Sequence, residues 1–173
     1  MFFYSEFFQK YITVEHRKLL IECMFDIYKK FKLFPETLFC AISLLDRFSF
    51  LKTNIRVNMY YLVGLICLSL SYKFIQGDDY DISMKKWLKC VENKPYTKKD
   101  FLWMEIFIFK KLDYFLTNPS IYELLYESIH KEKNDTEIFT DLNILHILNF
   151  ISEYKNLENN TQYQIVEKIL KIL

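Results

Sequence analysis

Apolar residues recur along this chain at intervals of three and four, which is the spacing of a helix face. The stretch Val57–Phe74 departs from that pattern, because no charge lies between Arg56 and Lys73 and the segment is apolar on every side. Such a segment fits either the middle of a helical core or a bilayer. A membrane span needs about 20 apolar residues, and this stretch contains Ser69 and Ser71. A buried central helix is therefore favoured.

The same spacing predicts helices on both sides of this stretch. Pro35 suits the first turn of a helix, and Thr97 with Asp100 resembles a capping box at the start of another. A break at Asn118-Pro119 divides the predicted helices into two groups, and the pattern begins again after it. Besides a short segment at Phe2–Tyr11, the predicted helices are about Val14–Phe31, Pro35–Phe50, Val57–Phe74, Ile82–Val91, Thr97–Tyr114, Ser120–His130, Glu137–Tyr154 and Gln162–Leu173.

The predicted fold class is therefore all-α. We expect an N-terminal helical segment at residues 1–13, a five-helix unit at residues 14–117, and an incomplete second helical repeat at residues 118–173. Composition supports this fold class, because only 2 Gly and 3 Pro are present and these provide little turn chemistry for a fold of many strands.

Charge and motif content argue against several classes of function. A net charge of +1 is unlike a dedicated nucleic-acid binder, which needs a marked basic excess. Because no glycine-rich phosphate loop, G-x-S-x-G or H-E-x-x-H motif occurs, we expect no catalytic residue. The four cysteines are widely separated and the three histidines lack ligand spacing. We therefore expect free thiols, no metal and no cofactor.

The N-terminus lacks the basic region of a signal peptide, so an intracellular protein is expected. Lysines gather between residues 85 and 99. A solvated face explains them, and a patch for an acidic partner is the alternative. These lysines are Lys85, Lys86, Lys89, Lys94, Lys98 and Lys99.

Four charged residues lie where helical spacing predicts apolar surroundings: Arg17, Asp46, Lys73 and Glu105. A carboxylate or ammonium in such a place is costly unless it finds a partner. Arg17 and Asp46 belong to the first two predicted helices, and pairing inside the core is favoured for them. Lys73 and Glu105 lie near helix edges, where either an internal partner or a second protein could complete them.

Eight short segments, in their order and spacing, resemble a cyclin, and most of all the A/B-type mitotic cyclins. No single segment is specific, but the ordered set covers about Val14–Leu125. The segments are His16-Arg17-Lys18-Leu19-Leu20, Glu36-Thr37-Leu38, Asp46-Arg47-Phe48, Leu62-Val63-Gly64, Tyr72-Lys73-Phe74, Tyr96-Thr97-Lys98-Lys99, Met104-Glu105 and Asn118-Pro119-Ser120.

The resemblance implies a five-helix cyclin box whose third helix is the hub, with Leu62 in its centre and an internal ion pair between Arg17 and Asp46. It also implies that Lys73 and Glu105 bind the αC helix of a cyclin-dependent kinase. An apolar rim around two such polar groups is suited to anchoring a helix. The expected rim residues are Leu70, Phe74, Phe109, Tyr114 and Leu116.

The function that this resemblance implies is that of a regulatory subunit. It would form a heterodimer with a cyclin-dependent Ser/Thr protein kinase, hold the αC helix of that kinase inward, and act in cell-cycle control in the nucleus, the cytoplasm or both. No nucleic acid, membrane or small-molecule cofactor is expected. The alternatives are a cyclin-fold interaction or TFIIB-like transcription module without kinase activation, and a membrane-associated helical protein built on Val57–Tyr72.

Three features depart from the family pattern. Ile75-Gln76 replace two acidic residues that commonly follow the Lys-Phe pair, which puts contacts near the kinase activation segment in doubt. Cys23 replaces a tryptophan and Tyr61 replaces a glutamine, both in the substrate-docking patch of A/B-type cyclins. We therefore do not assign that docking patch to this chain. The second repeat also lacks its last helices.

Overall fold

The computed structural model describes residues 12–51, 55–77, 82–91, 96–116, 120–132, 140–153 and 162–171, and all regular secondary structure in these ranges is helical. This confirms the all-α prediction. The helices are α1 (Val14–Phe31), α2 (Pro35–Phe50), α3 (Val57–Ile75), α4 (Met84–Lys89), α5 (Lys98–Lys111), α6 (Ile121–Glu132), α7 (Asp141–Glu153) and α8 (Gln162–Leu170).

The helix bounds agree with the sequence pattern at most ends. Two helices are shorter than predicted: α4 keeps only its middle, and α5 stops at Lys111 instead of Tyr114. The start of α5 is as predicted, because the Thr97 hydroxyl accepts from the Asp100 N–H and the Asp100 carboxylate accepts from the Thr97 N–H. The segment Phe2–Tyr11, and the predicted ends at Glu137, Tyr154 and Leu173, lie outside the described residues.

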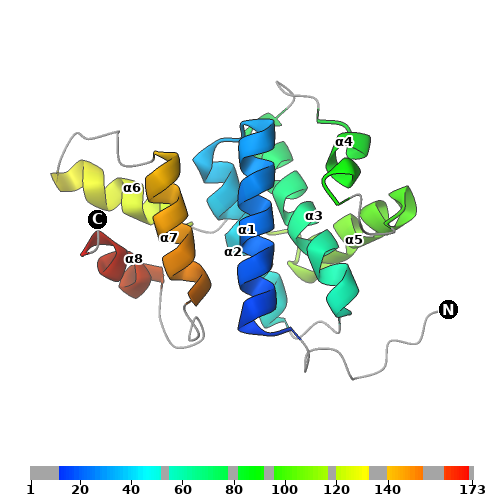
Figure 1. The fold of residues 1–173 in the computed structure, drawn as a ribbon, viewed down its shortest axis with the longest axis horizontal. Coiled ribbons are helices and arrows are strands. Elements are labelled where there is room, and N and C mark those ends of the chain that lie inside the picture. The colour runs from blue at the N-terminus through cyan, green and yellow to red at the C-terminus, as the bar shows by residue number, and fades with distance from the viewer. Residues whose placement is uncertain are drawn as a thin grey trace.

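Helix α3 lies at the centre of the first five helices (Figure 1). It packs against α1, α2 and α5, and Trp87 of α4 contacts Tyr72 near its C-terminal end. Every residue from Leu62 to Tyr72 is buried. By length and composition α3 could cross a membrane, but 67% of its most apolar window is buried inside the protein. It therefore occupies the position of a core helix.

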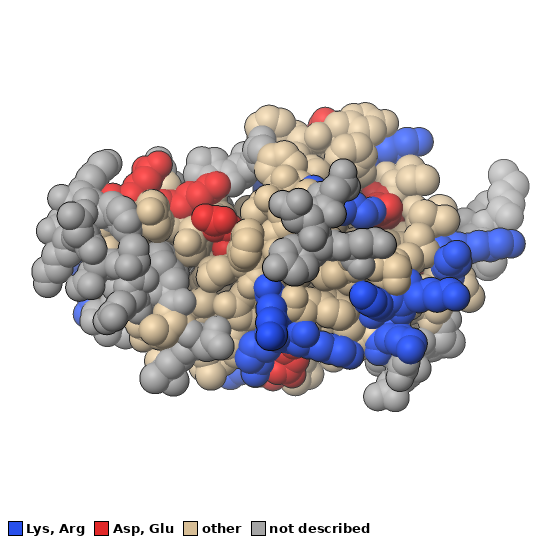
Figure 2. Space-filling view, turned by 90° about the horizontal axis from the view of Figure 1, so that it is seen from above, with Lys and Arg blue, Asp and Glu red and all other residues tan. Residues whose placement is uncertain are grey.

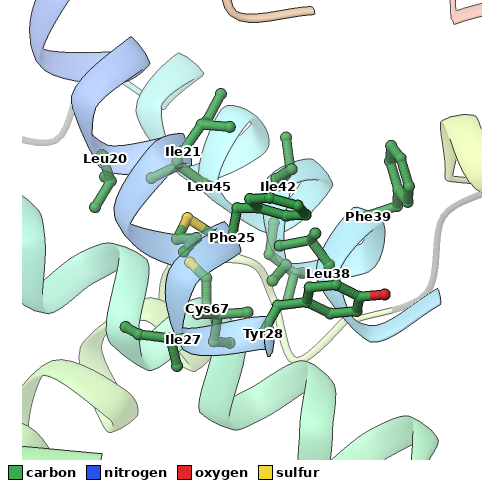
Figure 3. Close-up of a cluster of buried hydrophobic side chains, with 14 of the residues drawn as sticks. Leu20, Ile21, Phe25, Ile27, Tyr28, Leu38, Phe39, Ile42, Leu45 and Cys67 are labelled. Carbon is green, nitrogen blue, oxygen red and sulfur yellow. The ribbon is translucent and has the colours of Figure 1, made fainter. Parts of the chain in front are cut away.

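Side chains from α1, α2 and α3 form the main apolar cluster (Figure 3). Phe25 of α1, Ile42 of α2 and Cys67 of α3 are all buried there. Burial raises the pKa of the Cys67 thiol, so this cysteine behaves as a core residue and not as a reactive thiolate. Leu62 is completely buried, as expected of the centre of the hub helix.

Gly64 lies where α3 packs tightly against Leu20 of α1. A Cβ atom added at Gly64 would lie 2.5 Å from Leu20 Cδ1 and 3.0 Å from Leu20 Cγ. Because Leu20 is 1% exposed, it has little space into which it could move. Glycine is therefore required here by packing and not by backbone conformation.

Helices α6, α7 and α8 form a second group beside the first (Figure 1). Helix α7 packs against α1, α6 packs against α2, and α8 packs against α6 and α7. One polar contact also joins the groups, because Arg17 Nη1 of α1 donates to the Ile151 carbonyl oxygen of α7 at 2.9 Å. The buried face of this second group is apolar and includes Leu125, Ile144, Ile151 and Ile165.

Candidate functional site

Lys73 and Glu105 meet at the surface between α3 and α5. Lys73 Nζ lies 2.5 Å from Glu105 Oε1. The two side chains differ in exposure, because 57% of the Lys73 side chain is exposed and only 17% of that of Glu105. Lys73 is in the last turn of α3, where the helix dipole favours a cation. The result is a largely desolvated carboxylate covered by a solvent-facing ammonium.

Aromatic side chains lie close to this pair in the sequence and are accessible to a partner. Phe74 follows Lys73 and is 51% exposed, while Tyr114 is 60% exposed. The Tyr114 ring packs edge-on against Phe109, with ring centroids 5.0 Å apart. Phe109 and Leu116 are partly buried. Leu70 differs from the expectation, because it is only 7% exposed and contributes to the core beneath the surface.

The turn after α5 sets the position of Tyr114. Asp113 (φ 51°) and Tyr114 (φ 61°) both adopt left-handed backbone conformations, which cost about 1–2 kcal/mol for a residue with a side chain. The Tyr114 N–H nevertheless donates to the Phe109 carbonyl at 2.9 Å and closes the helix end. This turn stops α5 three residues early and directs the chain back over the end of the helix.

Arg47 holds that turn against α2. Its Nη2 donates to the Phe115 carbonyl at 2.8 Å, and its guanidinium carbon lies 5.7 Å from the centre of the Phe115 ring. The sequence pattern did not identify this role for Arg47. The Asp46-Arg47-Phe48 motif drew attention to Arg47 but did not indicate its partner. That partner is a backbone carbonyl 68 residues away, and a backbone carbonyl cannot be recognised from the residue types in a sequence.

Gln76 has an internal role at the end of α3. Its Oε1 accepts from the Phe34 N–H at 3.1 Å and from the Thr37 hydroxyl at 2.9 Å. Thr37 is fully buried at the start of α2, so its hydroxyl needs this acceptor. In the sequence, Gln76 was notable only because it replaces an acidic residue of the cyclin pattern. The structure shows that its side chain joins α3 to α2.

Gln76→Ala is expected to lower the free energy of unfolding by about 1 kcal/mol, because two donors at the start of α2 lose their acceptor. Thermal unfolding followed by circular dichroism measures this change. Gln76→Glu keeps the acceptor oxygens and is the matched control, with an expected stability close to that of the unchanged protein. Equal stability of all three proteins would contradict the capping role.

Arg17 and Asp46 form a bidentate pair between α1 and α2. Arg17 Nε donates to Asp46 Oδ1 at 2.8 Å, and Nη2 donates to Oδ2 at 2.9 Å. Their side chains are 13% and 22% exposed. Burial alone would lower the pKa of Arg17, but the charge and hydrogen bonds of Asp46 outweigh burial and raise it. The third guanidinium nitrogen, Nη1, donates to the Ile151 carbonyl, so Arg17 joins α1 to both α2 and α7.

The region of the family's substrate-docking patch has a mixed surface in this chain. Leu19 is 51% exposed, while Cys23 and Tyr61 are partly buried. Burial raises the pKa of Cys23. Within the described residues, no three His, Cys, Asp or Glu side chains are placed to hold a metal ion. The charged pair between α3 and α5 is therefore the candidate functional site.

Comparison with known proteins gives a consistent result. The family model described as "Cyclin, N-terminal domain" matches residues 3–117. The G2/mitotic-specific cyclin-2 of Medicago sativa is 28% identical over 122 residues, which is 70% of this chain and 36% of that protein. Cyclin-B2-1 of Arabidopsis thaliana is 32% identical over 109 residues, which is 63% of this chain and 24% of that protein. The chain thus spans well under half the length of these two relatives.

One solved structure adds a comparison of folds. A viral cyclin from herpesvirus saimiri superposes with a TM-score of 0.70 at 17% sequence identity, over 92% of this chain and 69% of that one. At this identity the likeness shows the fold alone. That fold is a five-helix box, here α1–α5, followed by a second helical group.

Proposed function

Because this chain belongs to the cyclin family, we propose that it is the regulatory subunit of a cyclin-dependent protein kinase and that it activates the kinase in cell-cycle control. The mitotic relatives support a role of this kind. The observation that carries the proposal is the Lys73–Glu105 pair, which lies beside exposed aromatic side chains on the box. We further propose that it acts inside the cell, in the nucleus, the cytoplasm or both.

The pair is suited to binding the end of a helix. A carboxylate such as that of Glu105 accepts hydrogen bonds from backbone N–H groups, and an ammonium such as that of Lys73 donates to backbone carbonyls. In the free protein the two groups satisfy each other. A partner helix would have to offer both kinds of group to replace that contact, which makes the site selective for a helix terminus with apolar side chains beside it.

Activation would follow from a shift in the population of kinase conformations. The ion pair that positions ATP in a kinase requires its αC helix to be inward. A protein that binds only the inward conformation favours it by the difference between its affinities for the two states. In this mechanism the chain contributes no catalytic group, and its residues act only by contact with the kinase.

Glu105→Ala and Lys73→Ala test the proposal. Each is expected to weaken binding of a purified cyclin-dependent kinase by about thirtyfold or more, since a central polar group in an interface contributes about 2 kcal/mol or more. Pull-down and peptide phosphorylation by the mixed proteins are the measurements. The melting temperature of Glu105→Ala should change little, because this change leaves only the largely exposed Lys73 without its partner. Lys73→Ala leaves the mostly buried Glu105 carboxylate unpaired and should melt at a lower temperature, so circular dichroism must show that it is folded under the binding conditions.

Lys110→Ala and Glu127→Ala are matched controls, because both residues are exposed and neither lies in the pair. They should bind the kinase like the unchanged protein. If Glu105→Ala and Lys73→Ala also bind and activate normally, this site does not bind the kinase. If the unchanged protein binds the kinase but does not stimulate phosphorylation of the peptide, the chain is a kinase-binding module that does not activate the kinase.

A further inference from the structure

Five exposed lysines at one end of the molecule have ammonium groups without a hydrogen-bond or ion-pair partner within the described part of the chain. Two of them follow each other closely at the end of α1, and the other three lie on α4. We call these residues the basic face: Lys30, Lys32, Lys85, Lys86 and Lys89. The neighbouring Lys29 differs from them, because its Nζ lies 3.3 Å from Asp26 Oδ1.

An aromatic contact holds the two parts of the basic face together. The Phe31 ring of α1 packs edge-on against Trp87 of α4, with centroids 5.1 Å apart. Trp87 also contacts Tyr72 of α3, with centroids 5.9 Å apart, and is only 1% exposed. Phe31 lies between Lys30 and Lys32 in the sequence, and Trp87 follows Lys86. The lysines are therefore presented on a fixed support.

Charge is unevenly distributed over this end of the protein. The C-terminal end of α1 and helix α4 both lie at the upper edge of Figure 1, and Figure 2 views the molecule from that side. Lys and Arg side chains gather in the centre and on the right of this view, where only a few of the visible Asp and Glu side chains lie among them. The whole chain has a net charge of only +1, so the basic face is a local feature and does not reflect a basic protein.

The lysines of α4 repel one another. Lys85 and Lys89 are four residues apart and Lys86 and Lys89 are three apart, so both pairs are neighbours on the helix surface. The helix contains no acidic residue that could offset this repulsion. Trp87 fixes α4 despite it.

We propose that the basic face binds an acidic segment of the proteins that the associated kinase phosphorylates. Lysine ammonium groups are point charges that pair with carboxylates or phosphorylated serines without a fixed geometry. The helix is about 9 Å long at 1.5 Å per residue, so a short extended acidic run could contact α4 and the end of α1 together. Only the identity of the protein that carries this segment rests on the proposed function. Nucleic acid is disfavoured, because the basic face contains no arginine and the overall charge is close to zero.

The direct test measures binding of a fluorescein-labelled poly-glutamate peptide to the purified chain by fluorescence anisotropy. The double variant Lys85→Glu/Lys89→Glu is expected to bind at least about tenfold more weakly, and raising the salt concentration should weaken binding to the unchanged protein. Lys85→Arg/Lys89→Arg should keep the affinity, because it keeps the charge. Lys110→Glu/Lys171→Glu makes the same change of charge elsewhere on exposed residues and should also keep it.

Three outcomes would overturn the proposal. They are no binding of the peptide by the unchanged chain, an equal loss in the Lys110→Glu/Lys171→Glu control, and tighter binding of duplex DNA than of the peptide. Circular dichroism checks that each variant is folded. None of these results depends on a kinase, so they are independent of the test of Glu105 and Lys73.

A second measurement tests the link to the substrate. With the kinase bound, Lys85→Glu/Lys89→Glu should raise the KM of a substrate that carries an acidic segment by about tenfold. The KM of the same substrate without that segment should not change. An equal KM for both substrates with the unchanged complex would show that the acidic segment is not used.

Discussion

Arg17→Ala is expected to lower the free energy of unfolding by about 3–5 kcal/mol, because it leaves the carboxylate of Asp46 largely buried without its partner. The same substitution removes the donor to the Ile151 carbonyl on α7. Thermal unfolding should show a melting temperature lower by roughly 10 °C or more. Much of the protein is expected to be insoluble at growth temperature, since the loss is comparable to a large part of the stability of a domain.

Two other variants separate the contributions to this effect. Lys29→Ala removes the cation of an exposed pair with Asp26, whose side chains are 47% and 76% exposed, and should change stability by at most about 1 kcal/mol. Arg17→Lys keeps the charge but loses the bidentate geometry, so an intermediate loss is expected. A melting temperature of Arg17→Ala equal to that of Lys29→Ala would show that the pair with Asp46 does not stabilise the fold.

The two ion pairs between helices have different uses because their cations differ in exposure. The Arg17 side chain is 13% exposed, and each of its three nitrogens donates to an acceptor within the protein. The Lys73 side chain is 57% exposed, and among the described residues its ammonium has one hydrogen-bond partner, Glu105. A pair of the first kind is satisfied and closed to a partner. A pair of the second kind has unused donors that a second protein can reach.

The central part of the fold could be predicted from sequence because the distribution of apolar and polar residues around a helix indicates which of its faces are buried. Helix α3 is apolar on every side, and its buried run from Leu62 to Tyr72 follows from that pattern. The end of α5 could not be predicted in the same way. Asp113 and Tyr114 are not glycines, so nothing in their identity indicates the left-handed conformations that end the helix. Phe115 and Arg47 stabilise that turn through a contact between distant parts of the chain.

The candidate site was predictable only in part, for a related reason. Lys73 and Glu105 stand out as isolated charges in apolar surroundings, which is a local property of the sequence. The role of Gln76 depends on the packing of α2 against α3, and its two partners are about 40 residues away. Leu70 lies one turn before Phe74, yet it is buried while Phe74 is exposed. Helical spacing alone does not show where the surface begins.

Gly64→Leu is expected to destabilise the protein by about 3 kcal/mol, at the upper end of the usual cost of overpacking. Replacing glycine by a better helix former, such as alanine or leucine, normally stabilises a helix interior, by about 1 kcal/mol for alanine. A loss of stability in Gly64→Leu would therefore be opposite in sign to the effect of helix propensity. The reason is the position of Leu20, whose Cδ1 lies 2.5 Å from the place that a Cβ would occupy. A larger side chain at this position forces α1 and α3 apart.

The double variant Leu20→Ala/Gly64→Leu tests this cause. Leu20→Ala alone should cost about 2–5 kcal/mol, because it leaves a cavity in the core. The double variant moves a leucine side chain from α1 to α3 and roughly conserves volume, so its loss should be smaller than the sum of the two single losses by about 1 kcal/mol or more. Urea unfolding of the four proteins measures the coupling. Additive losses would show that contact with Leu20 is not what requires glycine at position 64.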